Sequence, residues 1–220
     1  EKLTRVPALP PGLTRINGRE FLFPSEPTGG TWIGVNDTGA TIALINWYSV
    51  AARVTGKASS RGQIARACLV ANSAEAVNHI LADQPLDRTN PFRLIGVFLA
   101  SRAVFEWRWN LRRLERCEHP WSTNTWISSG FDEPGAQQSR GRVFRDALRK
   151  KSAGSLRWLH SLHCSHGPER GPYSHCMHRA DAATVSYCEI IVTRRSAIMR
   201  YTPGPPCCST AKFGSSFRLR

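Results

Sequence analysis

The sequence predicts an α+β domain in which two antiparallel sheets pack together and helices lie outside them. Strand-like runs joined in pairs by short turns alternate along the chain with blocks of helical periodicity. Hairpins build antiparallel sheets, and separate helical and strand blocks are typical of the α+β class. The first hairpin is apolar on both faces of its strands, which indicates that the sheet is covered on each side.

The first hairpin is expected over residues 31–36 and 40–47, two runs rich in Thr, Ile, Val and Trp. Between them the sequence Asp-Thr-Gly at residues 37–39 supplies the turn. Ahead of the hairpin, residues 1–26 contain four prolines, and their apolar residues follow neither a helical nor a strand period. We expect an extended surface segment there, with one short strand at residues 18–23.

Helical periodicity follows the hairpin. Ser60 is placed to cap a helix that runs through Leu69, and Ser73 to cap a second helix over residues 74–82. Two prolines, at residues 85 and 91, prevent this pair from continuing. Further helices are predicted over residues 137–151 and 155–162.

The remaining strands are predicted from apolar alternation. A second hairpin is expected over residues 92–100 and 103–109, followed by residues 111–130 as loop with short strand pieces. Later strand candidates are residues 173–179, 184–193 and 197–202. Residues 203–220 are rich in Gly, Ser, Pro and basic residues, so we expect a single domain over 1–202 and a basic, disordered tail over 203–220.

Composition narrows the class of protein. The chain has 220 residues and a net charge of +14, and none of its apolar runs is long enough to cross a bilayer. No basic-then-apolar leader precedes Glu1, and seven irregularly spaced cysteines indicate reduced thiols, so we expect a cytoplasmic protein. The arginines are scattered and accompany no nucleic-acid-binding motif, so a nucleic-acid partner is not expected.

Several short motifs together resemble one known family. They are GGTWIGVN at residues 29–36, ALIN at 43–46, SRGQ at 60–63, SSGFDEPG at 128–135 and CMHRADAATVSYCEIIV at 176–192. Over roughly residues 1–207 the chain is similar to the Asn-Arg-Asp-Glu family, also called the transport-and-Golgi-organisation type. The resemblance implies a four-layer αββα sandwich of antiparallel sheets, the fold of N-terminal-nucleophile amidohydrolases.

The resemblance also implies a nucleophilic Cys at the start of an upstream strand, activated by its own α-amine. Glu1 would be the last letter of the family signature, so this chain is expected to lack that strand and the nucleophile, and to be inactive. The complete form would cleave or transfer an acyl group of a small-molecule amide through a Cys thioester. Whether the protein is an enzyme therefore stays open, as does its oligomeric state.

Supporting residues follow from the same resemblance. Asn46 stands where related amidohydrolases use an Asn at a strand end as an oxyanion donor, although it could simply satisfy a neighbouring backbone group. Asn124 is a possible second donor. Arg179 is the nearest candidate for a site arginine, and a solvated surface charge is its alternative interpretation. The expected substrate-binding residues are Trp32, Ser128 and Ser129.

A second class of function is metal binding. Five of the seven histidines fall in residues 160–178, together with two cysteines. This density of imidazole and thiol suits zinc or haem iron, although the spacing matches no compact zinc finger and the motif for haem is missing. The first expectation is no cofactor. The alternative ligand candidates are His163, Cys164, His166, Cys176 and His178.

Overall fold

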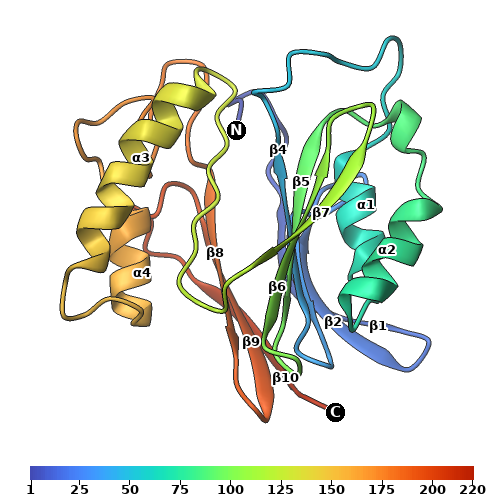
Figure 1. The fold of residues 1–220 in the computed structure, drawn as a ribbon. Coiled ribbons are helices and arrows are strands. Elements are labelled where there is room, and N and C mark those ends of the chain that lie inside the picture. Colours follow the sequence, from blue (N-terminus) through green and yellow to red (C-terminus); the bar gives the residue numbers. More distant parts are fainter. The chain divides into compact units, whose positions relative to one another are not determined.

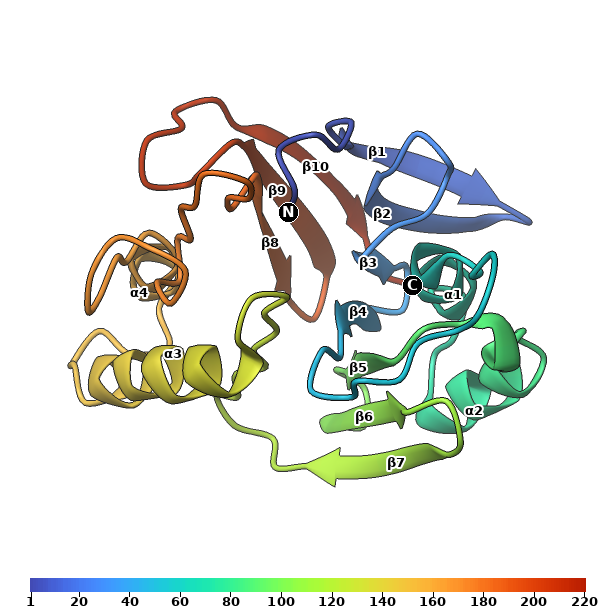
Figure 2. The ribbon, with the colours of Figure 1, turned by 90° about the horizontal axis from the view of Figure 1, so that it is seen from above.

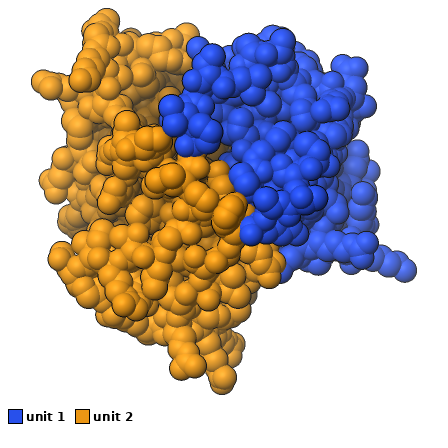
Figure 3. Space-filling model, turned by 180° about the vertical axis from the view of Figure 1, so that it is seen from behind, with its two compact units in different colours: residues 1–7, 122–187, 202–212 blue, residues 8–121, 188–201, 213–220 orange.

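The computed structural model describes residues 1–220, whose contacts divide the chain into two compact units (Figure 3). Unit 1 contains Glu1–Pro7, Ser122–Tyr187 and Thr202–Lys212. Unit 2 contains Ala8–Trp121, Cys188–Tyr201 and Phe213–Arg220. Each unit is therefore assembled from three stretches of sequence, and the single domain expected over residues 1–202 stays a prediction.

Unit 2 contains a seven-stranded antiparallel sheet in which the strands are neighbours in chain order (Figure 1). The strands are β1 (Leu9–Ile16), β2 (Arg19–Ser25), β3 (Ile33–Asn36), β4 (Thr41–Asn46), β5 (Phe92–Phe98), β6 (Ala103–Trp109) and β7 (Leu114–His119). Both predicted hairpins, β3–β4 and β5–β6, are confirmed. Gly39 has φ +77° in the β3–β4 turn, a conformation that glycine adopts without a steric penalty, and its N–H donates to the Asn36 carbonyl at 2.9 Å.

Helices cover one face of this sheet (Figures 1 and 2). The β4–β5 connection contains α1 (Arg61–Cys68), α2 (Ala74–Ala82) and a short 3₁₀ turn, Leu86–Arg88. Alternate residues of β4, Ile42 and Leu44, share a hydrophobic core with the helices. Because α1 and α2 begin where the two serines predicted, this helical layer is confirmed.

A second, three-stranded antiparallel sheet of order β10-β9-β8 packs on the other face of the larger sheet at β2 and β3. Its strands are β8 (Ser186–Val192), β9 (Ser196–Pro203) and β10 (Phe213–Arg218). Leu22 and Val35 of the larger sheet form one buried cluster with Ala197, Met199 and Phe217 of the smaller sheet. The α+β class and the pair of stacked antiparallel sheets are therefore confirmed.

Unit 1 contains the other helices, α3 (Glu133–Leu148) and α4 (Leu156–His163), and otherwise consists mostly of loops. The helices pack through a small core around Phe144 and Trp158, and the Trp158 indole donates to the Ala147 carbonyl at 2.9 Å. Asp132 caps α3 by accepting from the Gly135 N–H, which starts that helix four residues earlier than the periodicity predicts. None of the four helices combines the length and the apolar character that crossing a bilayer requires.

Two expectations are wrong: the strand at residues 173–179 and disorder throughout the tail at residues 203–220. Residues 173–179 form a loop with one isolated bridge, between His178 and Ala183, because the Ser174 hydroxyl bonds locally to the carbonyls of Gly171 and Cys176 and competes with a strand ladder. The tail is not disordered throughout. Its residues Phe213–Arg218 form β10, which pairs with β9 along its whole length and buries Phe217.

Candidate functional site

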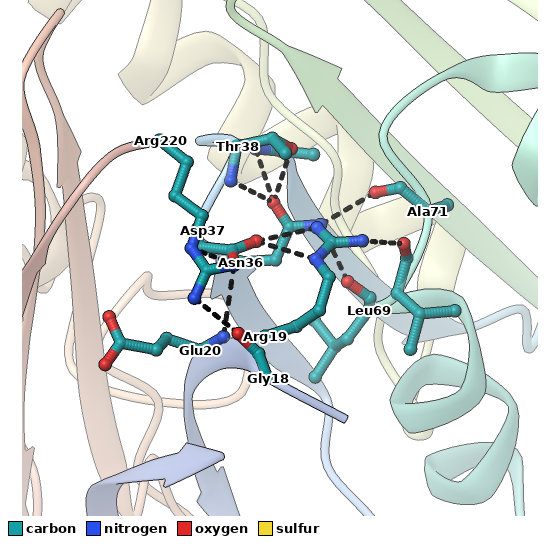
Figure 4. Close-up of polar contacts among 11 residues, drawn as sticks. Gly18, Arg19, Glu20, Asn36, Asp37, Thr38, Leu69, Ala71 and Arg220 are labelled. Atoms are coloured by element: carbon teal, nitrogen blue, oxygen red, sulfur yellow. Dashed lines mark hydrogen bonds and ion pairs between the residues drawn. The ribbon is translucent and has the colours of Figure 1, made fainter. Parts of the chain in front are cut away.

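The asparagine that ends the GGTWIGVN motif is a structural anchor (Figure 4). The buried Asn36 amide donates to the carbonyls of Leu69 and Ala71, both at 2.8 Å, and so ties the hairpin to the α1–α2 connection. Its carbonyl oxygen accepts from the N–H groups of Thr38 and Ala40 and orders the turn. All of its polar atoms are used in this way, which leaves no role in chemistry for Asn36.

Asp37 lies in the same network (Figure 4). Its fully buried carboxylate accepts from Arg19, with Nη2 2.7 Å away, and from the N–H of Glu20, and Arg220 pairs with its other oxygen at 3.3 Å. Burial alone would raise the pKa of Asp37, but the Arg19 hydrogen bond and the two nearby guanidinium charges lower it below its usual value. This buried ion pair joins β2 to the residue at position 220.

Asn46 and Trp32 lie at the open end of the β3–β4 hairpin, opposite its turn. Trp32 directly precedes β3, and its carbonyl accepts from the Leu44 N–H at 2.7 Å, whereas Asn46 is the last residue of β4. The Asn46 amide donates to the Tyr48 hydroxyl at 2.9 Å. By strand alternation, Asn46 shares the face of Ile42 and Leu44, which is the helix-covered face of the sheet.

Trp32 reaches the other sheet. Its indole forms a hydrogen bond with the thiol of Cys188 on β8, which favours the thiolate, but burial outweighs it and raises the pKa of Cys188 to about 12. Burial likewise raises the pKa of Cys68 to about 12. Both thiols therefore stay protonated near neutral pH and are poor nucleophiles.

The candidates Asn124, Ser128 and Ser129 lie in the loop that precedes α3 in unit 1. Asn124 donates to the Ser122 carbonyl at 3.0 Å, a local contact. The Ser128 carbonyl accepts from Arg140, and the Ser129 N–H donates weakly to Glu133 at 3.4 Å. The backbone of this loop is thus held by side chains of α3.

Arg140, which sequence reasoning missed, organises this part of unit 1. Its guanidinium donates to the carbonyls of Ser128, Pro172 and Ser174 at 3.0–3.1 Å. Burial lowers the pKa of Arg140. Its three hydrogen-bond partners are backbone carbonyls, so this side chain holds two loops to α3. An arginine on a helix face gives no sequence signal for this role.

Arg179 is engaged at the surface of unit 1. Its Nη2 lies 2.7 Å from a carboxylate oxygen of Asp181, and its guanidinium lies over the Phe131 ring, 4.7 Å from the ring centre. Both contacts engage the guanidinium within unit 1, and the choice between a site role and a surface charge for Arg179 stays a prediction.

A second candidate site is a cluster of two imidazoles and two thiols, which we call the Cys–His cluster: His166, Cys176, His178 and Cys207. One potential ligand atom from each residue lies within 4.8 Å of the others. Cys176 is fully buried and the other three are half-buried. The structure thus brings together three of the five predicted metal-ligand candidates and adds Cys207, which belongs to the predicted tail.

The other two candidates lie outside this group. Cys164 caps the end of α4, and its thiol approaches the His160 ring and the Pro206 carbonyl. His163 stacks near Tyr187, with ring centres 5.0 Å apart, and lies close to His175. Both ring nitrogens of His175 are buried without a hydrogen-bond partner, and burial lowers the pKa of His175 to about 4, so this imidazole is neutral.

Unit 2 thus has the layering of a sandwich-type α+β protein, with two stacked antiparallel sheets and helices outside the larger one. Residues 16–129, from the end of β1 to the loop before α3, match the model of the family described as Transport and Golgi organisation 2. This match covers more than half of the 220 residues, and the chain belongs to that family. A comparison with curated proteins gives no match.

Proposed function

We propose that the chain is the scaffold of an amidohydrolase or acyltransferase of the N-terminal-nucleophile type, acting on a small-molecule amide or acyl compound. Family membership supports the proposal, and one observation carries it: the stacking in unit 2 of two antiparallel sheets beneath a helical layer. In this reaction a thiolate attacks the amide carbonyl carbon, the C–N bond breaks, and the amine leaves with a proton. Water or an acceptor amine then takes the acyl group from the thioester.

The residues at the open end of the β3–β4 hairpin would serve this reaction. Trp32 reaches from the larger sheet to Cys188 of the smaller one, so a substrate between the sheets at this end would contact its indole. Asn46 ends β4 on the helix-covered face, and its amide, which donates to Tyr48 at 2.9 Å, would turn past the strand end to stabilise the developing oxyanion. The nucleophile would be a cysteine ahead of Glu1, because none of the seven cysteines present carries a free α-amine to activate it.

The proposal is tested by joining a cysteine-initiated family-type strand ahead of Glu1 and following amine release from N-acyl substrates. We expect a thiol-dependent acyl-enzyme, detectable by mass spectrometry, that chain 1–220 alone does not form. Trp32→Ala should raise KM and Asn46→Ala should lower kcat by about 100-fold, while Asn124→Ala serves as the comparison variant. A folded extended protein that forms no acyl-enzyme would contradict the proposal.

Metal binding is the second candidate function, and the Cys–His cluster favours zinc over haem. Four protein donors in one compact group fill a tetrahedral shell, whereas haem iron takes only one or two axial ligands from the protein. The prediction that nucleic acid is not a partner stays untested, and with a net charge of +14 a strongly salt-dependent nucleic-acid affinity would contradict it.

A further inference from the structure

Three separate stretches of unit 1 meet at the Cys–His cluster. His166 follows the end of α4, and the Cys176 N–H donates to the Ser165 carbonyl at 3.0 Å, which places Cys176 beside that turn. His178 lies on the same loop, where its N–H donates to the Gly171 carbonyl. The third stretch, which contains Cys207, is held against α4 because the Cys164 thiol donates to the Pro206 carbonyl at 3.3 Å.

The spacing of the donor atoms matches one coordination shell. A tetrahedral zinc ion, about 2.0–2.1 Å from imidazole nitrogens and about 2.3 Å from thiolate sulfurs, holds two nitrogens about 3.3 Å apart and a nitrogen and a sulfur about 3.6 Å apart. Here the Nε2 atoms of His166 and His178 are 3.2 Å apart, and Cys207 Sγ is 3.5 Å from His178 Nε2. A hydrogen bond between the imidazoles would explain the first distance, but it would not explain why two thiols join the same group.

We propose that His166, Cys176, His178 and Cys207 form a structural zinc site that closes unit 1. The donor set is two imidazoles and two thiols without a carboxylate, a combination that selects zinc over magnesium or calcium. Two thiolates neutralise the charge of Zn²⁺. Four protein ligands leave no open position for water or substrate, so the site holds the fold together and performs no chemistry.

The site ties loop segments that are otherwise held by Arg140 and by local hydrogen bonds, without a large core of their own. Unit 1 has a small helical core around Phe144 and Trp158, and its chain from residue 164 to 185 is almost entirely loop. A metal ion bound by residues 166, 176, 178 and 207 would fix both this loop and the turn after β9 to the end of α4. Its binding free energy would therefore add to the stability of the folded unit.

One neighbouring charge opposes metal binding. The guanidinium of Arg170 lies 3.4 Å from Nδ1 of His178, the ring nitrogen that carries a proton when Nε2 binds a metal. Arg170 is exposed, so its side chain can turn into solvent. Arg170→Gln should therefore tighten zinc binding by up to about fivefold, the range expected for an exposed charge pair.

The test uses the full chain, purified under reducing conditions, with zinc quantified by mass spectrometry and cobalt(II) titrated by absorption spectroscopy. We expect one metal per chain, and the visible ligand-field and thiolate charge-transfer bands of a tetrahedral cobalt site. Cys207→Ser should weaken binding at least about tenfold. Cys208→Ser, the adjacent exposed thiol, is the matched control and should bind as the unmodified protein does.

If Cys207→Ser does not fold, X-ray absorption of the zinc-loaded unmodified protein tests the site by counting the sulfur and nitrogen neighbours of the metal. Two sulfur and two nitrogen neighbours would support the site. A shell with fewer than two sulfurs, equal binding by Cys207→Ser and the unmodified protein, or equal weakening by Cys208→Ser would overturn it. A disulfide between Cys176 and Cys207 in the reduced, metal-supplied protein would also overturn it, because both thiolates must be free.

Discussion

Glu106, on β6, is a fully buried carboxylate that contacts three basic side chains. Arg93 donates to one of its oxygens, and Arg108 and His119 each lie 2.8 Å from the other. Burial alone would raise the pKa of Glu106, but these hydrogen bonds and the guanidinium charges outweigh it and lower the pKa to about 2. The carboxylate thus holds β5, β6 and β7 together near one edge of the larger sheet.

Glu106→Gln should lower the free energy of unfolding at pH 7 by roughly 3 kcal/mol, because it leaves two partly buried guanidinium groups without their anion. The folded pKa, about 2, lies below the usual value of 4.5, so the stabilisation is complete above pH 4.5 and is lost as the pH falls towards 2. Urea denaturation at a series of pH values measures it. The difference between the variant and the unmodified protein should shrink in acid.

The control for this substitution is Glu115→Gln. Glu115 pairs with the exposed Arg113. Its substitution should therefore change the free energy of unfolding by no more than about 1 kcal/mol. A pH-independent difference for Glu106→Gln would show that the loss comes from packing and not from the charge.

At the scale of elements, two serines give the same sequence signal and make different contacts. Ser73 caps α2, with its hydroxyl oxygen accepting from the Ala76 N–H at 3.2 Å. Ser60 occupies the same position before α1, but its side chain makes no cap hydrogen bond. The helix start at Ser60 is set by backbone contacts instead, including the Thr31 N–H donating to the Gly62 carbonyl at 3.0 Å.

Ser73→Ala should therefore destabilise the protein by about 1 kcal/mol, the usual effect of losing a side-chain cap. Ser60→Ala is the matched control and should change the free energy of unfolding by only a few tenths of a kcal/mol, roughly a third of the Ser73→Ala effect. Thermal denaturation of the two variants side by side measures the difference. Equal losses would mean that Ser60 forms a cap in solution.

Elements with a strong local signal were predictable, and those that depend on distant contacts were not. The β3–β4 and β5–β6 hairpins and the starts of α1 and α2 follow from turn chemistry, periodicity and capping residues. β1 and β10 were missed because Pro, Gly and Ser suggest an irregular chain, and these strands exist through pairing with β2 and β9. The strand expected at residues 173–179 failed because Ser174 bonds locally.

The candidate sites show the same limit. Histidine and cysteine density pointed to three members of the Cys–His cluster, but Cys207 lies 29 residues along the chain from His178, in a segment without a structural signal. Residues that act through the backbone, such as Asn36 and Arg140, carry no pattern that sets them apart from ordinary polar residues. Only the three-dimensional contacts identify them.

At the scale of the whole molecule, β10 is an integral part of unit 2. Phe217 is buried between the sheets with Met199 and Leu22, whereas Phe213 on the same strand is about half exposed. The smaller sheet thus takes one of its three strands, and part of its core, from residues 213–218.

Phe217→Ala should destabilise the protein by about 3 kcal/mol or more, as expected when a large side chain is removed from a packed core. Phe213→Ala is the matched control on the same strand and should have an effect below about 1 kcal/mol. Chemical denaturation gives both values. Similar small effects for the two variants would show that β10 does not pack as described.

The buried carboxylate of Asp37 is completed by Arg220, which follows it by almost the entire sequence, and unit 1 likewise needs residues 202–212. During translation, neither unit can finish folding before these residues have left the ribosome. The emerging polypeptide must therefore remain partly open, and exposed to chaperones and proteases, until residues 202–220 have emerged. A premature stop codon close to residue 200 would release a protein deprived of the closing pieces of both halves.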